Sequence, residues 1–141
     1  MSKLDKLVLK NIMTPLPYVA QPRDNLIQIR EQMEIHNIRH LPVRDGSEII
    51  GIISERDLAL TRALSNHIVD EVAISARVIC TPDPYVVDFQ ERIDVVLQYM
   101  AKHRIGSVIV TENDEMVGII TTTDVCRACG FFLQELFDEG G

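Results

Sequence analysis

The segment TPLPYV at residues 14–19 returns as TPDPYV at residues 81–86, an offset of 67 residues (81 − 14 = 67). The offset holds without a gap as far as GIISERD at residues 51–57 and GIITTTD at residues 118–124. Between these segments the matched pairs are Met33 with Met100, His36 with His103, Ile38 with Ile105, and Val43 with Val110. Self-similarity at one fixed period is typical of a repeated structural unit, so the chain is predicted to contain the same unit twice.

The expected elements follow the same order in both copies. After each Thr-Pro turn a short strand is predicted, at residues 18–20 and 85–87, and apolar residues then recur at helical spacing. The core-facing residues of these two helices are Leu26, Ile29 and Met33 in the first copy and Ile93, Val96, Leu97 and Met100 in the second. Asp24 or Asn25 is expected to cap the first helix, whereas Arg92 is a poor cap for the second.

A hairpin and a closing helix complete each copy. The hairpin strands are predicted at residues 41–43 and 49–53 in the first copy and at 108–110 and 116–120 in the second. An Asp-Gly pair at residues 45–46 and an Asn-Asp pair at residues 113–114 are expected to form the turns, because these residue types tolerate positive φ. Ser54 and Thr121 are good N-cap residues for the helices that follow. Each unit is therefore predicted to be β-α-β-β-α.

Composition limits the classes of function. The chain has 141 residues, 46% of them hydrophobic, which suits one compact domain or two small ones that share a core. Its 21 acidic and 14 basic residues give a formal charge of −7, so it lacks the basic face that a general nucleic-acid binder needs. No apolar run is long enough to span a bilayer, and the first residues lack the apolar core of a signal peptide. We therefore expect a cytoplasmic protein that binds neither nucleic acid nor membrane, with Cys80, Cys126 and Cys129 as reduced thiols.

The repeated motif of Gly, two Ile, Ser or Thr, two variable residues and Asp resembles the signature of CBS (cystathionine β-synthase) domains. The segments MTP at residues 13–15 and IRHLPV at residues 38–43 resemble that family's opening turn and middle strand. The resemblance runs from about Ile12 to Cys129 and implies an α/β (α+β) fold in which the two repeats pack as a pseudo-two-fold pair. The predicted boundaries are a lead-in at residues 1–11, the first repeat at 12–64, a connector at 65–78, the second repeat at 79–130 and an apolar and acidic tail at 131–141.

The motif also suggests a binding chemistry without the family. A strand that ends at Ser54 and passes directly into a helix leaves free backbone N–H groups, which suit a phosphate or sugar oxygen. Asp57 lies one turn further on the same edge, and its two carboxylate oxygens can accept hydrogen bonds from both hydroxyls of a ribose. The alternative is a structural cap, because S-x-x-D is a common capping pattern at the start of a helix.

The resemblance implies two ligand pockets in the cleft between the repeats. Ser54 with Asp57, and Thr121 with Asp124, are the polar ends of these pockets. The adenine is expected near the Thr-Pro turns, against Thr14, Pro15 and Val19 in the first copy and Thr81, Pro82 and Val86 in the second. A family site often joins the Asp motif of one repeat to the opening turn of the other, and the sequence leaves this pairing open.

The two copies differ in charge. The first carries Arg39, His40 and Arg56 where the second has Gly106, Ser107 and Thr123. Because Arg is the side chain best matched to phosphate oxygens, the Asp57 pocket is predicted to hold the phosphate end, with Arg56 as the leading contact. The alternatives are a solvated Arg56 and a His40 that only edges its strand. In the second copy Arg104 or Lys102 is available for a phosphate, or that pocket prefers a nucleoside or stays empty.

Structural roles are expected for most other conspicuous residues. His36 and His103 fall where their helices end, a position that the helix dipole favours for histidine. Cys126 and Cys129 form a lone C-x-x-C with no partner pair, so they are expected to be small core residues, and no metal site is predicted. The tail at residues 131–141 has three open roles: covering its own domain, cementing a dimer or docking a partner.

The leading functional hypothesis is a non-catalytic, energy-sensing regulatory module that needs no cofactor and binds AMP, ADP or ATP in the cleft. By resemblance it is expected to be a homodimer, in keeping with the apolar Ile27 and Ile35 outside the core stripe, and to act on a separate effector protein. Two alternatives are a sensor of another adenosyl ligand (S-adenosylmethionine, NAD or a cyclic dinucleotide) and a partner-docking or structural module with vestigial pockets. A third is an enzyme built on Asp57, His40 and Cys80, for which the sequence shows no nucleophile and base with an orienting carboxylate.

Overall fold

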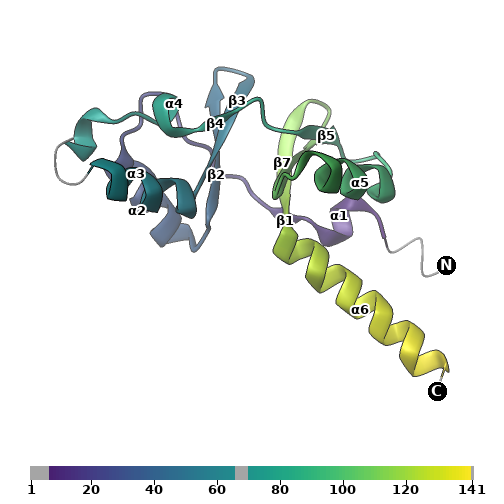
Figure 1. Ribbon diagram of the computed structural model, residues 1–141. Coiled ribbons are helices and arrows are strands. Elements are labelled where there is room, and N and C mark those ends of the chain that lie inside the picture. Colours follow the sequence, from purple (N-terminus) through teal and green to yellow (C-terminus); the bar gives the residue numbers. More distant parts are fainter. Residues whose placement is uncertain (1–6, 66–69, 141) are drawn as a thin grey trace. The chain divides into compact units, whose positions relative to one another are not determined.

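The computed structural model describes residues 7–65 and 70–140, and these form two compact units (Figure 1). One unit, unit 1, combines residues 7–17 with residues 85–140. The other, unit 2, is the continuous segment Tyr18–Pro84. The units therefore do not follow the repeats as written along the chain, because the opening segment of each repeat belongs to the unit that holds the rest of the other repeat.

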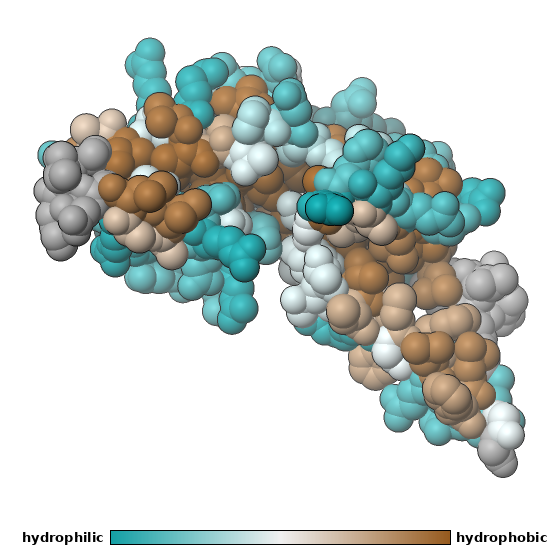
Figure 2. All heavy atoms as spheres, in the orientation of Figure 1, coloured by the Kyte–Doolittle hydropathy of each residue, from teal (hydrophilic) through white to brown (hydrophobic). Residues whose placement is uncertain are grey.

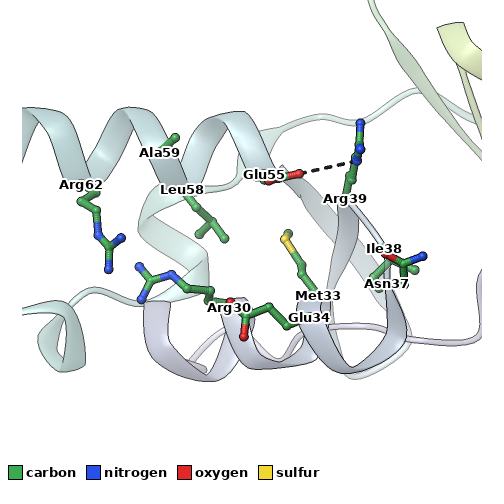
Figure 3. Close-up of a pocket in the computed structure, with 10 residues that line it drawn as sticks. All are labelled: Arg30, Met33, Glu34, Asn37, Ile38, Arg39, Glu55, Leu58, Ala59 and Arg62. Atoms are coloured by element: carbon green, nitrogen blue, oxygen red, sulfur yellow. Dashed lines mark ion pairs between the residues drawn. The ribbon is translucent and has the colours of Figure 1, made fainter.

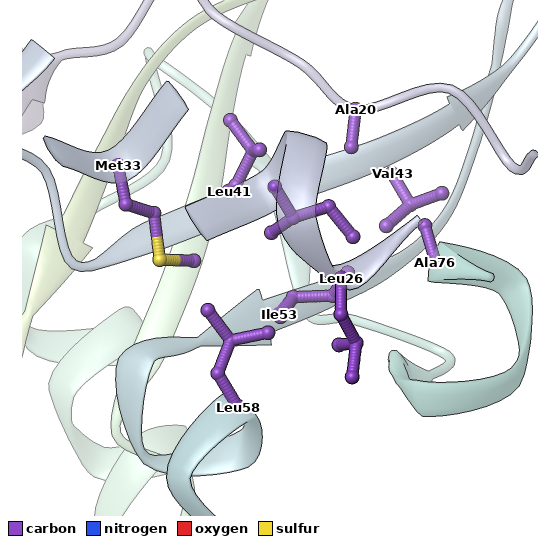
Figure 4. Packing of buried hydrophobic residues seen from close by; sticks show 9 residues of the cluster. Ala20, Leu26, Met33, Leu41, Val43, Ile53, Leu58 and Ala76 are labelled. Carbon is purple, nitrogen blue, oxygen red and sulfur yellow. The ribbon is translucent and has the colours of Figure 1, made fainter. Parts of the chain in front are cut away.

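Unit 2 is a three-stranded antiparallel sheet covered by helices. Its elements are α2 (Leu26–His36), β2 (His40–Asp45), β3 (Glu48–Ser54), α3 (Glu55–Ser65), the short 3-10 helix η2 (Glu71–Ala73), α4 (Ala76–Ile79) and β4 (Thr81–Pro82). The strand order is β2-β3-β4, with β3 in the middle. Its core, drawn in Figure 4, consists of Ala20, Leu26, Ile29, Met33, Leu41, Val43, Ile53, Leu58 and Ala76. The apolar stripe predicted for α2 is therefore the one that the core uses.

Unit 1 repeats this plan with one more strand. Its elements are α1 (Leu9–Ile12), β1 (Thr14–Pro15), β5 (Val86–Asp88), α5 (Ile93–His103), β6 (Ser107–Glu112), β7 (Glu115–Thr121) and α6 (Thr122–Gly140). The strand order is β1-β7-β6-β5, and only the β5–β6 pair is parallel. Its core consists of Leu9, Ile12, Val87, Val96, Met100, Val108, Val110 and Ile120. The mixed α/β class expected from the sequence is confirmed.

Helix caps and turns follow the residue types at their ends. Asn25 and Gln28 form a reciprocal capping box at the start of α2, whereas Arg92 makes no side-chain cap at the start of α5. The Asn-Asp turn at residues 113–114 has positive φ at both residues, 52° and 62°, as a tight hairpin requires. In the first copy the turn lies one residue later than predicted, because Asp45 still pairs with Glu48 and only Gly46 has positive φ.

The short strand predicted at residues 18–20 is reduced to a single bridge between Ala20 and Val43. Its counterpart in the second copy is the strand β5, which is prolonged by a bond from the N–H of Phe89 to the carbonyl of Thr111. The residue that matches Phe89 in the first copy is Pro22, which has no N–H to donate. The first ladder therefore cannot extend as the second does.

The glycine of the repeated motif allows a close approach of two strands. Gly51 in β3 pairs with Pro82 in β4, and Gly118 in β7 pairs with Pro15 in β1. A Cβ atom at residue 51 would lie 2.8 Å from the carbonyl oxygen of Thr81, and one at residue 118 would lie 2.9 Å from that of Thr14. Glycine is therefore needed where the opening strand of the other repeat is packed.

Replacing Gly118 with alanine is expected to lower the free energy of unfolding by about 2 kcal/mol, because the backbone of β1 must move to make room. The matched control is Gly130→Ala inside α6, where a Cβ meets no atom within 4 Å and should raise stability by up to about 1 kcal/mol. Urea unfolding of both variants measures the difference. Equal effects of the two substitutions would contradict the close approach.

Candidate functional site

In unit 2 two residues of the first copy of the motif, Ser54 and Asp57, hydrogen-bond each other at the junction of β3 and α3. The N–H of Asp57 donates to Ser54 Oγ at 3.1 Å, and the N–H of Ser54 donates to Asp57 Oδ2 at 2.8 Å. This is the reciprocal cap that was the structural alternative for the S-x-x-D pattern. The second carboxylate oxygen, Oδ1, accepts no hydrogen bond from any residue that the structure describes. Capping therefore leaves one oxygen of Asp57 available to a ligand.

The opening turn beside this motif comes from the second repeat. β4 pairs with β3 so that Thr81 lies opposite Ile52 and Pro82 opposite Gly51, just before Ser54. Val19, which is half-buried, also belongs to unit 2. The pairing that the sequence leaves open thus has a geometric answer within unit 2: the Ser54–Asp57 motif shares a sheet with Thr81 and Pro82.

A cavity of about 500 Å³ opens at the same junction. It is lined by Arg39, His40, Ser54, Glu55, Arg56 and Ala59. Arg56 is exposed and makes no hydrogen bond or ion pair with another residue in the described part of the chain. The ion pair of Arg39 with Glu55 is long, 3.7 Å, and both side chains are mostly exposed, so solvent screens it. This cavity therefore holds Arg56, which has no partner in the described chain, and Arg39, whose pairing with the cavity residue Glu55 is weak.

A second hollow of about 400 Å³ lies between α2 and α3 and shares Arg39, Glu55 and Ala59 with the first (Figure 3). Its other two arginines, Arg30 and Arg62, are committed to Glu71, with hydrogen bonds of 3.1–3.2 Å. These bonds, first from Arg30 and then from Arg62, hold the pKa of Glu71 below its ordinary value. Arg30 and Arg62 therefore fasten η2 to α2 and α3, and the arginines available to an anion are Arg39 and Arg56.

In unit 1 the aspartate of the second copy of the motif, Asp124, accepts more hydrogen bonds than Asp57 does in the first copy. Asp124 is only 4% exposed and is the one buried charged residue in the described part of the chain. Its Oδ2 accepts from the N–H and the hydroxyl of Thr121, at 2.9 and 3.1 Å. Its Oδ1 accepts from the hydroxyl of Thr14 at 2.9 Å and from Arg127 Nη1 at 3.1 Å. Both carboxylate oxygens are thus in use.

The two sites therefore differ in what their aspartates can still bind. The residue that matches Arg127 in the first copy is Leu60, which cannot donate a hydrogen bond. Thr81, which matches Thr14, makes no hydrogen bond to Asp57. The sequence shows the charge difference at residue 56, but it does not show that Thr14 and Arg127 meet at Asp124, because those partners come from opposite ends of the chain.

The remaining candidate residues divide between the two units. In unit 1 Thr14 and Thr121 bond Asp124, Pro15 pairs with Gly118 on β7, and Val86 lies exposed on β5. His40 in unit 2 pairs across the sheet with Ser54 and lines the cavity beside Arg56. Arg104 takes the left-handed position that ends α5, directly after Lys102 and His103.

Four expectations for other residues have clear outcomes. His36 and His103 end their helices as predicted; His36 also stacks on the ring of Tyr18, and His103 makes a tilted ring contact with Tyr99. Met33 and Met100 are buried core residues. Cys126 and Cys129 were wrongly assigned to the core: both are exposed, because α6 packs through Val125 and Ala128 on an adjacent face. The tail is also no separate segment, since α6 runs without a break from Thr122 to Gly140.

Cys80 is not suited to be a nucleophile. The thiol is half-buried and packs where β4 passes Gly51. Burial raises the pKa of Cys80, so the thiol stays protonated at neutral pH, and the thiolate is the reactive form. Among residues 7–65 and 70–140, no three His, Cys, Asp or Glu side chains are grouped to hold a metal ion. The helices in those ranges include none with the length and apolar character to cross a membrane.

A family model for the CBS domain matches residues 9–62 and 74–130, once for each copy of the motif. The chain belongs to the CBS domain family. Solved CBS-pair structures share its fold: a Vibrio cholerae protein named for acetoin utilization (AcuB) is 30% identical, with a TM-score of 0.72 over 94% of this chain and 96% of its own. The CBS pair of protein MJ0100, solved with 5′-methylthioadenosine and S-adenosyl-L-methionine, is 27% identical, with a TM-score of 0.73 over 87% and 95%.

Curated sequences match this chain over very different shares of their own length. Protein YlbB of Bacillus subtilis is 29% identical over 124 residues, which is 83% of this chain and 78% of YlbB. The L-aspartate semialdehyde sulfurtransferase of Methanocaldococcus jannaschii is 27% identical over 87% of this chain but over only 23% of its own length. The match therefore covers most of one small protein and a minor part of a larger enzyme.

Proposed function

We propose that this CBS pair senses an adenine nucleotide of the AMP, ADP or ATP class, bound in unit 2. The observation that carries the proposal is the cavity of about 500 Å³ in which Arg56 lies beside Ser54 and has no partner in the described chain. The phosphates would occupy this cavity, where Arg56 and Arg39 supply charge. The start of α3 adds the positive end of a helix dipole.

The rest of the nucleotide follows from the residues around the cavity. Asp57 Oδ1, which accepts no bond from the described chain, has two lone pairs and would accept from both ribose hydroxyls. The adenine would lie against the Thr81-Pro82 turn and Val19, which share unit 2 with Asp57. The site needs no catalytic group, and none is proposed.

The charge of the cavity favours a nucleotide over the sulfonium ligand of the MJ0100 structure. S-adenosylmethionine carries a positive charge at sulfur, which two arginines would repel, whereas phosphates would be attracted. The closed Asp124 site in unit 1 is proposed to stay empty or to take a neutral nucleoside, since its carboxylate is already fully bonded. The ligand common to both classes is adenosine, and the phosphates provide the selectivity.

Regulation would then require that bound and free forms differ in a way that another molecule detects. We propose a separate effector protein as that molecule and a homodimer as the responding form, in the cytoplasm. Nucleotide binding would stabilise the conformation of the chain that has the higher affinity for the phosphates. Energy sensing follows if AMP and ATP compete for the same cavity.

The proposal is tested by titration calorimetry and thermal shift with AMP, ADP, ATP, adenosine, S-adenosylmethionine, NAD and a cyclic dinucleotide. Binding to the folded state raises the melting temperature by mass action. We expect the phosphate-bearing adenosines to shift it and S-adenosylmethionine to shift it less. If no ligand shifts it at millimolar concentration, the chain is instead a docking module whose pockets are unused.

Replacing Arg56 with glutamine is expected to weaken nucleotide binding about tenfold, because one charge-assisted contact to phosphate is worth about 1.5 kcal/mol. The control is Arg23→Gln, which removes the same charge from an exposed site in unit 2 outside the cavity. Calorimetry at low and high salt should show that the Arg56 effect shrinks as salt rises. If Arg56→Gln and Arg23→Gln bind the nucleotide with equal affinity, Arg56 does not contact the phosphates.

A further inference from the structure

The closing helix α6 carries two apolar stripes, and only one of them is used inside its own chain. The inner stripe packs on the core of unit 1 through Val125 and Ala128, with Phe132 half-buried beyond them. The outer stripe follows alternating spacings of three and four residues, which is the heptad pattern of a helix that pairs with another helix. Its members are Cys126, Cys129, Leu133, Leu136 and Gly140, with Phe137 on its flank.

The outer stripe is exposed along its length. Cys126 and Cys129 are exposed, Leu133 and Leu136 are 49% and 43% exposed, and Phe137 is 76% exposed. Figure 2 shows hydrophobic side chains gathered along α6, and other hydrophobic patches lie among hydrophilic ones on the rest of the visible surface. An exposed apolar surface of this kind on a small domain marks an interface.

The sizes of the side chains favour a partner that runs in the opposite direction. The first half of the stripe is small, with two cysteines, and the second half is bulky, with Leu136 and Phe137. Two parallel copies would set cysteine against cysteine and phenylalanine against phenylalanine, which leaves gaps at one end and crowding at the other. Two antiparallel copies centred near Leu133 would set the small Cys129 against the bulky Leu136 and Phe137 on both sides of the centre, with Cys126 beside Gly140 at each end.

The distribution of charges along α6 also favours an antiparallel partner. Arg127 lies in the first half of the helix, while Glu135, Asp138 and Glu139 lie in its last turns, which contain no basic residue. Acidic residues at a helix C-terminus oppose the helix dipole. In an antiparallel pair each acidic end lies beside the first half of the other helix and the positive end of its dipole, where Arg127 is already paired with Asp124. A parallel pair would place the acidic ends together.

We propose that α6 forms an antiparallel, two-fold symmetric contact with the α6 of a second copy of this chain. The contact is centred near Leu133, so that Cys129 of one copy faces the Leu136 and Phe137 region of the other. A two-fold axis makes the same stripe serve both copies, as self-complementary interfaces require. The contact is separate from the nucleotide cavity and does not depend on it.

The first test compares adjacent substitutions that add the same charge to the same helix. Leu133→Glu buries a carboxylate in the proposed contact, whereas Gln134→Glu places it on the polar face. Light scattering after size exclusion should give a dimer for the unaltered chain and for Gln134→Glu, and a monomer for Leu133→Glu with unchanged circular dichroism. A monomeric unaltered chain overturns the proposal. So does a Leu133→Glu variant that stays dimeric while Ile27→Glu with Ile35→Glu is monomeric, because the interface would then lie on α2.

The second test fixes the direction and does not depend on whether Leu133→Glu folds. One chain carries Cys126→Ser and keeps Cys129, and a second, tagged to differ in mass, carries Cys126→Ser, Cys129→Ser and Phe137→Cys. A short bismaleimide should link the two kinds of chain to each other, as an antiparallel pair requires. Predominant links between two chains that both keep Cys129 would overturn the antiparallel arrangement. A chain with both α6 cysteines replaced by serine measures the background from Cys80.

Discussion

Replacing Asp57 with alanine is expected to weaken adenine-nucleotide binding about a hundredfold. The carboxylate would lose its hydrogen bonds to the ribose, and two bonds to a charged group are together worth about 3 kcal/mol. Calorimetry measures the loss directly. The effect should exceed that of Arg56→Gln, because the ribose contact is half-buried beside Ser54 while the arginine contact is exposed and screened by solvent.

Two controls separate this loss from a loss of the cap. Asp57→Asn keeps an oxygen that accepts from the N–H of Ser54, so it should bind poorly and yet fold like the parent. Asp24→Ala removes a carboxylate that bonds the N–H of Gln21 in the same unit, and it should leave binding unchanged.

A 2′-deoxynucleotide tests the same contact from the ligand side. The parent chain should bind it about tenfold more weakly than the ribonucleotide, since one hydroxyl is missing. Asp57→Ala should bind both equally, because its partner for that hydroxyl is already gone. A deoxy effect that persists in Asp57→Ala would show that another residue holds the ribose.

The corresponding substitution in unit 1, Asp124→Ala, is expected to act on stability. It should lower the free energy of unfolding by about 3 kcal/mol, because the Thr14 hydroxyl, the Thr121 N–H and Arg127 all lose a buried, charged acceptor. Asp57→Ala removes one capping bond at a less buried site and should lower it by only about 1 kcal/mol. Urea unfolding of the two variants, side by side, measures the contrast.

The variant Thr14→Val measures how much of the stability lost in Asp124→Ala comes from the hydrogen bond of Thr14. If the hydroxyl of Thr14 bonds the carboxylate, Thr14→Val and Asp124→Ala together should cost less than the sum of the single substitutions. Strict additivity would mean that β1 is held by its backbone pairing with β7 alone. Similar decreases in the free energy of unfolding for Asp57→Ala and Asp124→Ala would contradict the proposal that Asp124 makes more stabilising hydrogen bonds than Asp57.

Local features of this fold can be predicted well from the sequence. The repeat offset, the helical stripe ending at Met33 and the tight turn at residues 113–114 all depend on neighbours a few residues apart. The capping box at Asn25 and the absence of a side-chain cap at Arg92 follow from residue type in the same way.

Features that depend on distant partners could not be predicted in the same way. The strand predicted at residues 18–20 is only a single bridge, and the reason appears only when Pro22 is compared with Phe89, its counterpart in the second repeat. The placement of Cys126 and Cys129 in the core was wrong because α6 has two apolar stripes, and periodicity alone cannot say which one is covered. The saturation of Asp124 depends on a partner at Thr14, and only the pairing of β1 with β7 brings the two together.

The exchange of opening strands also bears on how the chain folds while it is being made. Domains generally fold in the order in which they leave the ribosome. Here the first described residues, in α1 and β1, belong to the unit that is completed last, because Thr14 pairs with Ile119. Unit 2 can close once β4 has emerged, whereas Leu9 and Ile12 have no core to join until β7 follows. A ribosome that stalls after β4 but before β7 would therefore display a closed unit 2 together with the uncovered apolar side chains of Leu9 and Ile12, which a chaperone can bind.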